Sequence, residues 1–292
     1  MAAPWQILWK KNEHPRDKDL VFHEPSHTYY IKGSSKNVIS VTGFVHQFCG
    51  HFDADATIDK MMRSPKWPQN KMYGKTKEEI KAIWNENGRV ASEAGTAMHL
   101  AIEMYLNDAA HLIPADVLAS VEWKYFMKFW NDHGHDLEPY RLEWEIWVEE
   151  LFLAGSLDAV FRRKSDGRFV IYDWKRSKEI KTENPWQSCL GPLSHLPDTN
   201  YWHYHMQLNV YRYILTKYYG LDIAELYLVI CHPDNKSYKR MRLNILEDEV
   251  ESMIEARRRA VAGGFKQVVV FDEEEDTAGA TGASASGFAI KL

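Results

Sequence analysis

A short hairpin signal, Asp166-Gly167, is the feature that most constrains how this chain folds. An Asp-Gly pair between apolar segments is typical of a tight turn that joins two antiparallel strands. Such segments flank it here in LFLAGSLDAVFRRKSDGRFVIYDWKRSKEI, residues 151–180. The segment therefore predicts a β-hairpin, and each of its strands carries an Asp where a packed sheet normally has an apolar residue.

The register that a two-residue turn implies places three charged side chains on one face of this hairpin. If Ser165 pairs with Arg168, then Asp158 lies opposite Lys175, and Asp173 lies diagonal to Asp158. Cross-strand neighbours are about 5 Å apart and diagonal ones about 7–8 Å, within joint reach of one ion. The other face has the composition of a core, with the residues Leu157, Ala159, Phe161, Val170, Tyr172 and Trp174.

Two interpretations of the charged face remain open at this point. The simpler one is a cross-strand salt bridge on a solvated face. Val160 and Ile171 share that face, however, and Gly155 leaves a place where another backbone or a ligand can approach closely. Two carboxylates on one face repel each other unless a cation lies between them. Oxygen ligands suit Mg²⁺ or Mn²⁺, and a neighbouring Lys can orient water or offset charge on a phosphate, so the face favours metal-dependent phosphodiester hydrolysis.

The composition is that of a globular protein with a sizeable core. The chain has 292 residues, of which 45% are hydrophobic and 26% are charged. A formal net charge of −5 does not by itself indicate a nucleic-acid-binding protein. Five consecutive acids at 272–276 account for that charge, so the remainder is near neutral and leaves room for a local basic groove.

The three cysteines, Cys49, Cys189 and Cys231, are far apart and form no CxxC pair. This pattern disfavours a disulfide framework, a Cys-rich zinc site and an iron–sulfur cluster. The N-terminus lacks a signal-peptide core, and no apolar stretch approaches the ~20 residues of a membrane span. We therefore expect an intracellular protein that is not secreted and has no membrane partner.

Periodicity and capping signals predict an α/β protein with a mixed sheet. From Glu93 onward the expected order is α-β-β-β-α-β, preceded by a hairpin and helices. One continuous helix is expected over 114–131. The predicted division is an N-terminal hairpin and helical extension at 1–75, a core at 76–271, and an acidic, Ala/Gly/Ser-rich disordered tail at 272–292.

The charged hairpin resembles a known signature. GSLD followed by IYDWK is similar to the motif of the PD-(D/E)XK nuclease superfamily, with Asp158 as the first acid and Asp173-Trp174-Lys175 as the triplet. Leu157 stands where the name of the motif has Pro. The resemblance implies a restriction-endonuclease-like core, in which a mixed central sheet is flanked by helices.

Two further motifs resemble the RecB-type, lambda-exonuclease-like branch of that superfamily. EAGTAMHLAIE, residues 93–103, is similar to its GTxxHxxxE helix, which implies that His99 is a metal ligand. QLNVY resembles its QxxxY helix, which implies that Gln207 and Tyr211 lie beside the active site. The N-terminal hairpin and VISVTGFV are similar to the start of mitochondrial genome maintenance exonuclease and of related viral or phage exonucleases.

The resemblance implies a DNA exonuclease that uses Mg²⁺ or Mn²⁺, acting in replication, recombination or repair. His99, Asp158, Asp173 and the carbonyl of Trp174 would hold the metal, and Lys175 would position water or stabilise the transition state. The expected partner is DNA, as a single strand or a duplex end, with a recombination or replication protein as a further candidate. Two alternatives stay open, which are a structure-specific endonuclease of the same fold and a non-cleaving DNA-binding module. Polarity, strand preference, RNA activity and oligomeric state also stay open.

Further residues are weaker candidates for the metal site, for zinc binding or for DNA contact, and most of them also have a simple structural explanation. Glu103 lies one helical turn after His99, and Glu145 shares its predicted face with Glu143 and Glu149, which is equally consistent with a solvated edge. A helical His-x-His spacing directs His203 and His205 to different sides, so a zinc site among the residues His195, Asp198, His203 and His205 is disfavoured. The candidates for DNA contact are Arg176, Lys178, Lys66 and Trp67.

Overall fold

The computed structural model describes residues 3–265 and residue 269, and its centre is a six-stranded mixed sheet. The strand order is β3-β5-β6-β7-β8, and β4 pairs with the other edge of β5. Strands β6 and β7 are parallel, whereas β4–β5, β5–β6 and β7–β8 are antiparallel, which confirms the predicted mixed sheet. The strands are β3 Ile39–Ser40, β4 Leu137–Val148, β5 Leu153–Arg163, β6 Phe169–Lys175, β7 Ile223–Ile230 and β8 Lys239–Leu243.

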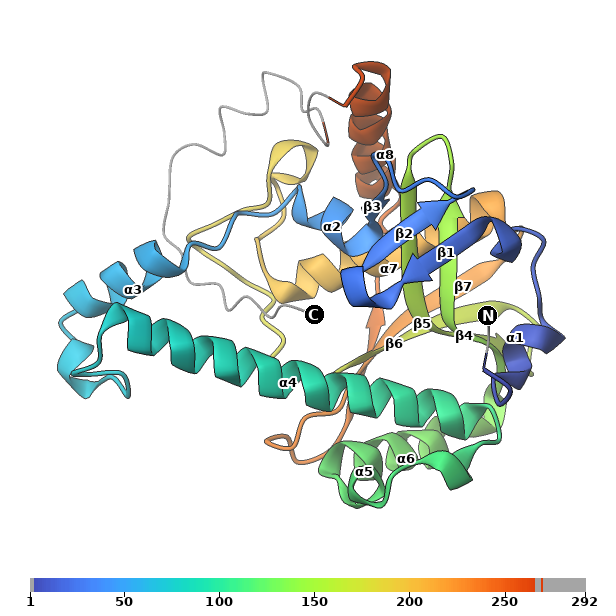
Figure 1. The fold of residues 1–292 in the computed structure, drawn as a ribbon, viewed down its shortest axis with the longest axis horizontal. Helices are drawn as coiled ribbons and strands as arrows, with labels where there is room; N and C mark the ends of the chain where they lie inside the picture. The colour runs from blue at the N-terminus through green and yellow to red at the C-terminus, as the bar shows by residue number, and fades with distance from the viewer. Residues whose placement is uncertain (1–2, 266–268, 270–292) are drawn as a thin grey trace.

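Helices cover both faces of this sheet (Figure 1). Helices α2, α7 and α8 contribute to the core on one face, and α1, α4 and α6 contribute to the core on the other. The predicted N-terminal hairpin is present as β1 Leu20–His23 and β2 Thr28–Ile31. The helices are α1 Ile7–Lys11, α2 Val41–His46, α3 Ala54–Arg63, α4 Lys77–Leu106, α5 Ala115–Ala119, α6 Val121–His133, α7 Asn200–Tyr218 and α8 Glu247–Ala262.

Side-chain caps fix where the helices near the site begin. Thr76 and Glu79 form a reciprocal capping box at the start of α4. The Ser40 hydroxyl accepts a hydrogen bond from the backbone N–H of Gly43 at the start of α2. The helix predicted as continuous over 114–131 is instead divided at Ser120, because this residue is extended and its hydroxyl caps α6 through the N–H of Trp123 at 3.1 Å.

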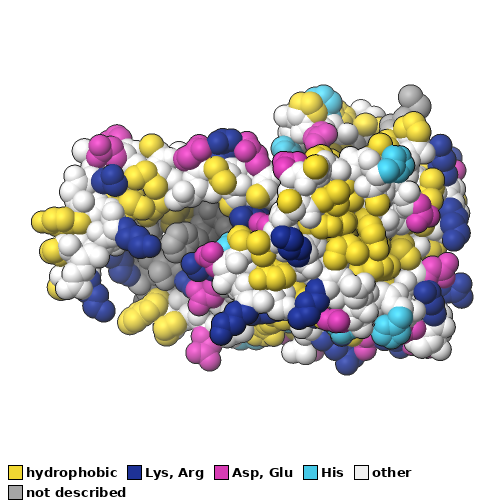
Figure 2. Space-filling view, turned by 90° about the horizontal axis from the view of Figure 1, so that it is seen from below, with side chains coloured by type: hydrophobic (Ala, Val, Ile, Leu, Met, Phe, Trp, Pro, Cys, Tyr) yellow, Lys and Arg dark blue, Asp and Glu magenta, His cyan; other side chains and the backbone are white. Residues whose placement is uncertain are grey.

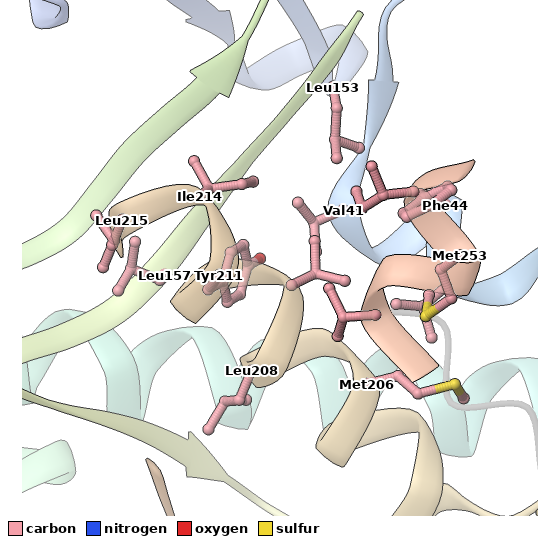
Figure 3. Packing of buried hydrophobic residues seen from close by; sticks show 14 of the residues in the cluster. Val41, Phe44, Leu153, Leu157, Met206, Leu208, Tyr211, Ile214, Leu215 and Met253 are labelled. Atoms are coloured by element: carbon pink, nitrogen blue, oxygen red, sulfur yellow. The ribbon is translucent and has the colours of Figure 1, made fainter. Parts of the chain in front are cut away.

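Helix α7 packs directly on β5, where Tyr211 of the helix and Leu157 of the strand belong to one buried cluster (Figure 3). A Cβ atom at Gly155 would lie 2.9 Å from Cε1 of Tyr211 and 3.0 Å from Cγ2 of Val41, so only glycine fits without a shift of its neighbours. The space that the sequence suggested for a ligand or another backbone is therefore filled by two core side chains. This contact brings α2 and α7 against the strand that carries Asp158.

The β5–β6 turn is longer than predicted, and it changes the register by two residues. Ala159 pairs with Tyr172, and the Arg163 N–H donates to the Arg168 carbonyl at 2.9 Å, which leaves four residues in the loop. Gly167 has a φ of +74°, and the Asp166 carboxylate accepts from the N–H of Arg168 at 3.1 Å, which stabilises this longer turn. A shift of two residues preserves the faces, but Asp158 does not lie opposite Lys175 as predicted.

Hydrophobic side chains gather on the face of the molecule seen from below in Figure 2. Exposed apolar residues in the segment around α5 include Leu112, Leu118 and Val121. Among the described residues, no helix has the length and apolarity needed to cross a membrane. The predicted division into 1–75 and 76–271 stays a prediction, and the segment 272–292, predicted to be disordered, lies outside the described residues.

Candidate metal centre

The candidate site lies where β5 changes its partner along one edge. Strand β4 runs along the other edge throughout. On the facing edge, β3 pairs with the first two residues of β5 and β6 pairs with Ala159–Arg162, and no strand in the described part of the chain pairs between them. The backbone N–H of Trp174 donates instead to Oδ2 of Asp158 at 2.7 Å. A side-chain carboxylate thus takes the place of a ladder carbonyl at the point where β5 and β6 separate.

The alternation of side chains also reverses at this point. Leu157 packs with Val160 in the core under α7, whereas Ala159 packs in the opposite core, so the prediction that Leu157 and Ala159 share a face is wrong. On β4, the residue beside Asp158 is Glu143, which has a φ of +42°. Non-glycine residues seldom adopt this left-handed conformation, and such residues concentrate at functional sites.

Glu143 is the site residue that sequence reasoning missed. Period-two alternation placed it on a common face with Glu145 and Glu149, because a regular strand was assumed. The left-handed backbone directs its carboxylate towards His99, with Oε1 of Glu143 3.5 Å from Nδ1 of His99. The strand pattern alone gives no signal for this conformation, so only the relative position of β4 and α4 reveals it.

Helix α4 brings His99 to the two strands. Its Nε2 lies 2.9 Å from the carbonyl oxygen of Trp174, and its Nδ1 lies 3.6 Å from Oδ2 of Asp158. Burial lowers the pKa of His99, but the carboxylates of Asp158 and Glu143 outweigh burial and raise this pKa to about 9. Without a metal, the imidazolium therefore acts as the cation between the two carboxylates.

Asp173 and Lys175 form a buried ion pair on β6. Oδ2 of Asp173 lies 2.7 Å from Nζ of Lys175, yet this oxygen has no partner with the angles of a hydrogen bond among the described residues. Burial and the neighbouring Asp158 raise the pKa of Asp173 to about 6, although Lys175 acts in the opposite direction. Burial disfavours the ammonium, but Asp173 and Asp158 together hold the pKa of Lys175 above its ordinary value.

Helix α7 contacts β5 just before Asp158 through a hydrogen bond of Tyr211. The Tyr211 hydroxyl donates to the Ser156 carbonyl at 2.7 Å, and the Gln207 amide lies 3.4 Å from the Tyr211 hydroxyl. Both side chains are buried, and the hydrogen bonds described for them join residues of α2, β5 and α7 rather than Lys175. The aromatic ring nearest to Lys175 in the described interactions is Tyr204, whose centroid is 5.0 Å from Nζ.

The two supporting acids occupy different surroundings. Glu103 is buried, and its Oε1 accepts from Nε2 of Gln6 at 2.7 Å, so it ties the N-terminal segment to α4. Burial raises the pKa of Glu103 to about 7. Burial likewise raises the pKa of Glu145 to about 7, but Glu145 is not in the group of donors that includes His99.

The four residues proposed for DNA contact lie outside this cluster. Nε of Arg176 is 2.7 Å from Oε1 of Glu122, and Nζ of Lys178 is 2.7 Å from Oδ2 of Asp234, so both cations already have carboxylate partners. Lys66 and Trp67 belong to the loop between α3 and α4. The 22 residues of α4 from its start to His99 span about 33 Å, which places this loop far from the metal donors.

The donor set fits a hard divalent cation. Donor atoms of His99, Glu143 and Asp158 all lie within 4.8 Å of one another, and the Trp174 carbonyl oxygen lies 2.9 Å from Nε2 of His99. The predicted ligand Asp173 is not in this group, and its Oδ2 is paired with Lys175. Oxygen donors predominate, which suits Mg²⁺ or Mn²⁺ better than a thiophilic metal. The structure thus gathers the predicted ligands His99, Asp158 and Trp174 and adds Glu143.

Comparison with known proteins gives only distant likenesses. No family model and no curated protein matches the chain. Among solved structures, the chain is similar to a protein named SSO0001, with 14% identity and a TM-score of 0.29 over 88% of this chain and 85% of that chain. It is also similar to a "Putative exonuclease" from Eubacterium rectale, with 12% identity and a TM-score of 0.41 over 80% and 84% of the two chains. Neither likeness is strong enough to assign a function.

Proposed function

We propose that this chain is a divalent-metal-dependent nuclease that hydrolyses phosphodiester bonds in DNA and acts as an exonuclease. The observation that carries the proposal is the convergence of His99, Glu143 and Asp158, whose donor atoms lie within 4.8 Å of one another, beside the buried Asp173–Lys175 pair. Three carboxylates beside one ammonium and one imidazolium leave an excess of negative charge, which favours the binding of a cation. The motif resemblance to PD-(D/E)XK nucleases supports the same chemistry.

His99, Glu143, Asp158, Asp173 and the carbonyl of Trp174 would hold the metal. A divalent cation bound there would supply Lewis-acid stabilisation of the charge that develops on a phosphate. The oxygen-rich donor set and its partial exposure, with His99 at 24% and Glu143 at 34%, are consistent with a site that a phosphate can reach. Mg²⁺ and Mn²⁺ are the cations that such donors prefer.

Lys175 is the residue that we expect to act on the substrate itself. Its ammonium is held by Asp173 at 2.7 Å and lies near the Tyr204 ring, so its position is fixed before substrate arrives. A preorganised positive charge in a buried site stabilises negative charge on a phosphate far better than a mobile one in water. Lys175 would also hold a water molecule in position through a second N–H donor.

Gln207 and Tyr211 serve the site as positioning residues. Tyr211 bonds to the carbonyl of Ser156, and Ser156 lies two residues before Asp158 in β5. The hydroxyl therefore fixes the stretch of β5 that carries no strand partner on this edge within the described residues. We expect Tyr211→Phe to lower activity by loosening Asp158 rather than by removing a reacting group.

The direct test is cleavage of end-labelled single- and double-stranded DNA oligonucleotides that are blocked at one terminus. We expect cleavage with Mg²⁺ or Mn²⁺, none with a chelator, and none with Asp158→Ala or Lys175→Ala. Asp222→Asn is the matched control, because it removes an exposed carboxylate at the far end of the same sheet. Full cleavage by either site variant would show that the site assignment is wrong.

A closed circular single strand separates the alternatives within this proposal. An exonuclease leaves the circle intact, whereas a structure-specific endonuclease of the same fold opens it. Tight metal-independent binding with no cleavage of any substrate in either Mg²⁺ or Mn²⁺ would replace the nuclease proposal with a DNA-binding module.

A further inference from the structure

A second group of metal-binding side chains lies where the end of α2 meets the start of α7. Donor atoms of Cys49, Asp198 and His203 all lie within 4.8 Å of one another. The three residues come from three segments of the chain, namely the segment just after α2, the loop after β6 and the first turn of α7. None of them belongs to the candidate metal centre, so this group calls for an explanation of its own.

The carboxylate of Asp198 is the centre of this group. Its Oδ2 accepts from the N–H of Gly50 at 2.7 Å, and its Oδ1 lies 2.5 Å from Nε2 of His203. The side chain of Asp198 is only 8% exposed. A buried carboxylate beside a thiol is costly unless further partners satisfy it, since a thiol is a weak hydrogen-bond donor.

Two thiols converge on the same place. Cys49 and Cys189 are both buried, and Sγ of Cys189 lies 3.8 Å from the carbonyl oxygen of Pro197, the residue before Asp198. The Cys49 thiol also points to the Val45 carbonyl, with Sγ 3.4 Å from the oxygen. Two sulfur atoms, a carboxylate and an imidazole are donors that suit Zn²⁺ and do not suit Mg²⁺.

We propose that Cys49, Cys189, Asp198 and His203 form a structural zinc site that fastens the β6–α7 loop to the end of α2. Four protein ligands with no open position are characteristic of structural rather than catalytic zinc. His203 meets this site alone, because His205 turns away and its Nδ1 contacts the Tyr201 carbonyl at 3.0 Å. The helical spacing that disfavoured zinc in the sequence therefore does not exclude it, since the other ligands come from elsewhere.

The β6–α7 loop already contacts the segment after α2, and a bound metal would stabilise this contact. The Leu190 N–H donates to the Phe48 carbonyl at 2.8 Å, which joins the loop to the segment after α2. The amide end of the Gln187 side chain packs against Gly50, where a Cβ atom would lie 1.6 Å from Nε2 of Gln187. This loop connects Lys175 on β6 to Gln207 on α7, which means that fastening it would stabilise two parts of the candidate active site.

Metal content tests the proposal without any reference to nuclease activity. Full-length protein purified with a reductant and loaded with Zn²⁺ should retain a single tightly bound Zn²⁺ after dialysis, as measured by mass spectrometry of the metal. Loading with Co²⁺ should give the absorption of a thiolate-to-cobalt charge transfer, which requires a cysteine ligand. Cys49→Ser and His203→Gln should each lose this absorption and the retained metal.

Matched controls distinguish the site from general effects. Cys231→Ser removes a buried thiol elsewhere in the fold, and His195→Gln removes an exposed imidazole on the same loop; both should bind metal as wild type does. Asp158→Asn should also retain the cobalt absorption, because the candidate metal centre is a separate site.

Thermal unfolding keeps the proposal testable if a variant folds poorly. Zn²⁺ should raise the unfolding temperature of the wild-type protein by mass action and leave that of Cys49→Ser and of the conservative Cys189→Ser unchanged. Failure of the wild-type protein to retain zinc, or equal retention by Cys49→Ser and His203→Gln, would overturn the proposal. Either result would leave the nuclease proposal untouched, since the two rest on different residues.

Discussion

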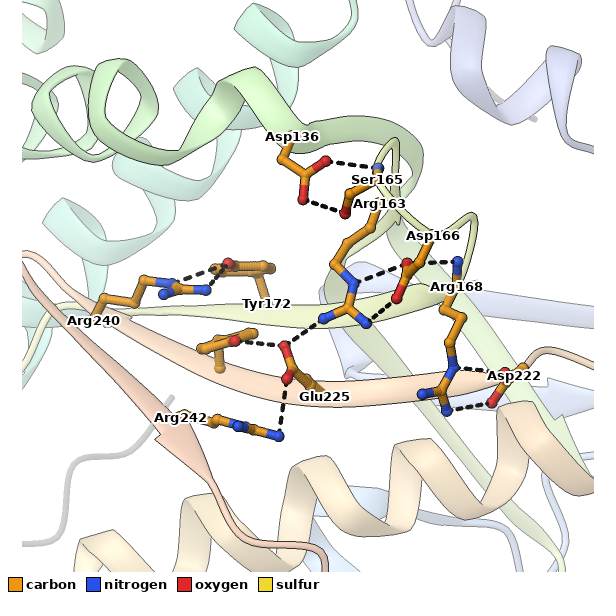
Figure 4. Close-up of polar contacts among 11 residues, drawn as sticks. Asp136, Arg163, Ser165, Asp166, Arg168, Tyr172, Asp222, Glu225, Arg240 and Arg242 are labelled. Carbon is orange, nitrogen blue, oxygen red and sulfur yellow. Dashed lines mark hydrogen bonds and ion pairs between the residues drawn. The ribbon is translucent and has the colours of Figure 1, made fainter.

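Both ends of the β5–β6 pair carry charged residues. At one end each carboxylate has its own cationic partner, and at the other end carboxylates outnumber cations. At the turn end, the carboxylate of Asp166 pairs with Arg163, that of Asp222 pairs with Arg168, and that of Glu225 pairs with Arg163 and Arg242 (Figure 4). Each of these carboxylates has a guanidinium partner at hydrogen-bonding distance. The charges are matched, and the β5–β6 ladder continues to the turn.

At the other end of the same strands, the charges are not matched. Three carboxylates, those of Glu143, Asp158 and Asp173, face one ammonium and one imidazole. The ladder between β5 and β6 stops there, and Glu143 adopts a left-handed backbone. We infer that the turn end contributes to stability, whereas the unmatched carboxylates of the open end lower stability and would favour a bound cation.

Asp158→Asn is the change with the largest expected effect, and it should move activity and stability in opposite directions. Loss of this ligand should lower metal-dependent cleavage by about 10³-fold, as loss of a central electrostatic group does. Burial raises the pKa of Asp158, and His99 and Lys175 offset only part of that effect, so the ionised carboxylate destabilises the metal-free fold. The isosteric amide should therefore raise the unfolding temperature in a chelating buffer at neutral pH.

The stability gain expected for Asp158→Asn should depend on pH in a defined direction. A group whose pKa is raised in the folded state stabilises the fold below its unfolded pKa, and this contribution is lost as the pH rises through the folded pKa. The difference between Asp158→Asn and wild type should thus be present at neutral pH and vanish below 3.8, the ordinary pKa of an Asp carboxyl. If the difference in unfolding temperature between Asp158→Asn and wild type grew on acidification, the ionised Asp158 carboxylate would not be the source of the instability.

Glu143→Gln compared with Glu145→Gln tests whether the left-handed residue belongs to the site. The two acids are two positions apart on β4, but only Glu143 has a donor atom in the group with His99 and Asp158. We expect Glu143→Gln to lower cleavage and metal affinity by about 10–100-fold. Glu145→Gln should leave both unchanged, as measured by titration of cleavage with Mn²⁺. If Glu145→Gln lowered cleavage and metal affinity and Glu143→Gln did not, Glu145 rather than Glu143 would belong to the site.

The element order could be predicted because the local signals are strong. The capping box of Thr76 and Glu79 sets the start of α4, and Gly220, with a φ of +70°, follows the end of α7 as expected. These features depend on residues close together in the chain. His99 could be placed with Asp158 only through the resemblance of their motifs to those of PD-(D/E)XK nucleases, because no local spacing connects α4 to β5.

The rest could not be predicted because it depends on contacts between distant segments. The register differed by two residues, since the carboxylate of Asp166 and the backbone of Gly167 favour a four-residue loop over the shorter turn. Glu143 entered the site through a backbone conformation that a period-two pattern does not show. Cys49 lies roughly 150 residues from Asp198 and His203, so no local spacing brings these three together.

Metal binding should stabilise one end of the strands alone. A ligand that binds only the folded state stabilises it by about 2.7 kcal/mol at a concentration of 100 times its Kd. Mn²⁺ should therefore raise the unfolding temperature of the wild-type protein and have no such effect on Asp158→Asn, whereas Glu225→Gln should respond to Mn²⁺ as wild type does. Equal shifts in Asp158→Asn and wild type would mean that Mn²⁺ binds elsewhere.

Glu225→Gln tests the matched end directly, and we expect a smaller change. The carboxylate of Glu225 accepts from Arg163 at 2.7 Å and from the Tyr227 hydroxyl at 2.6 Å, and it pairs with Arg242 at 2.9 Å. Loss of its charge should lower the free energy of unfolding by about 1–3 kcal/mol and leave cleavage unchanged. Burial acts to raise the pKa of Glu225, but Tyr227 and the arginines outweigh it and lower the pKa, so its contribution should disappear as the pH falls through that folded value.

The smallest effect is expected from Asp222→Asn, which removes an ion pair of a different kind at the same end. Arg168 and Asp222 are 48% and 68% exposed, and water screens their attraction even though Nε and Oδ2 are 2.8 Å apart. We expect no resolvable change in unfolding temperature or in cleavage, in contrast to Glu225→Gln three residues further along the chain, in β7. A loss of stability as large as that of Glu225→Gln would show that the turn end acts as one cooperative network, so that matching of charge rather than burial would determine its stability.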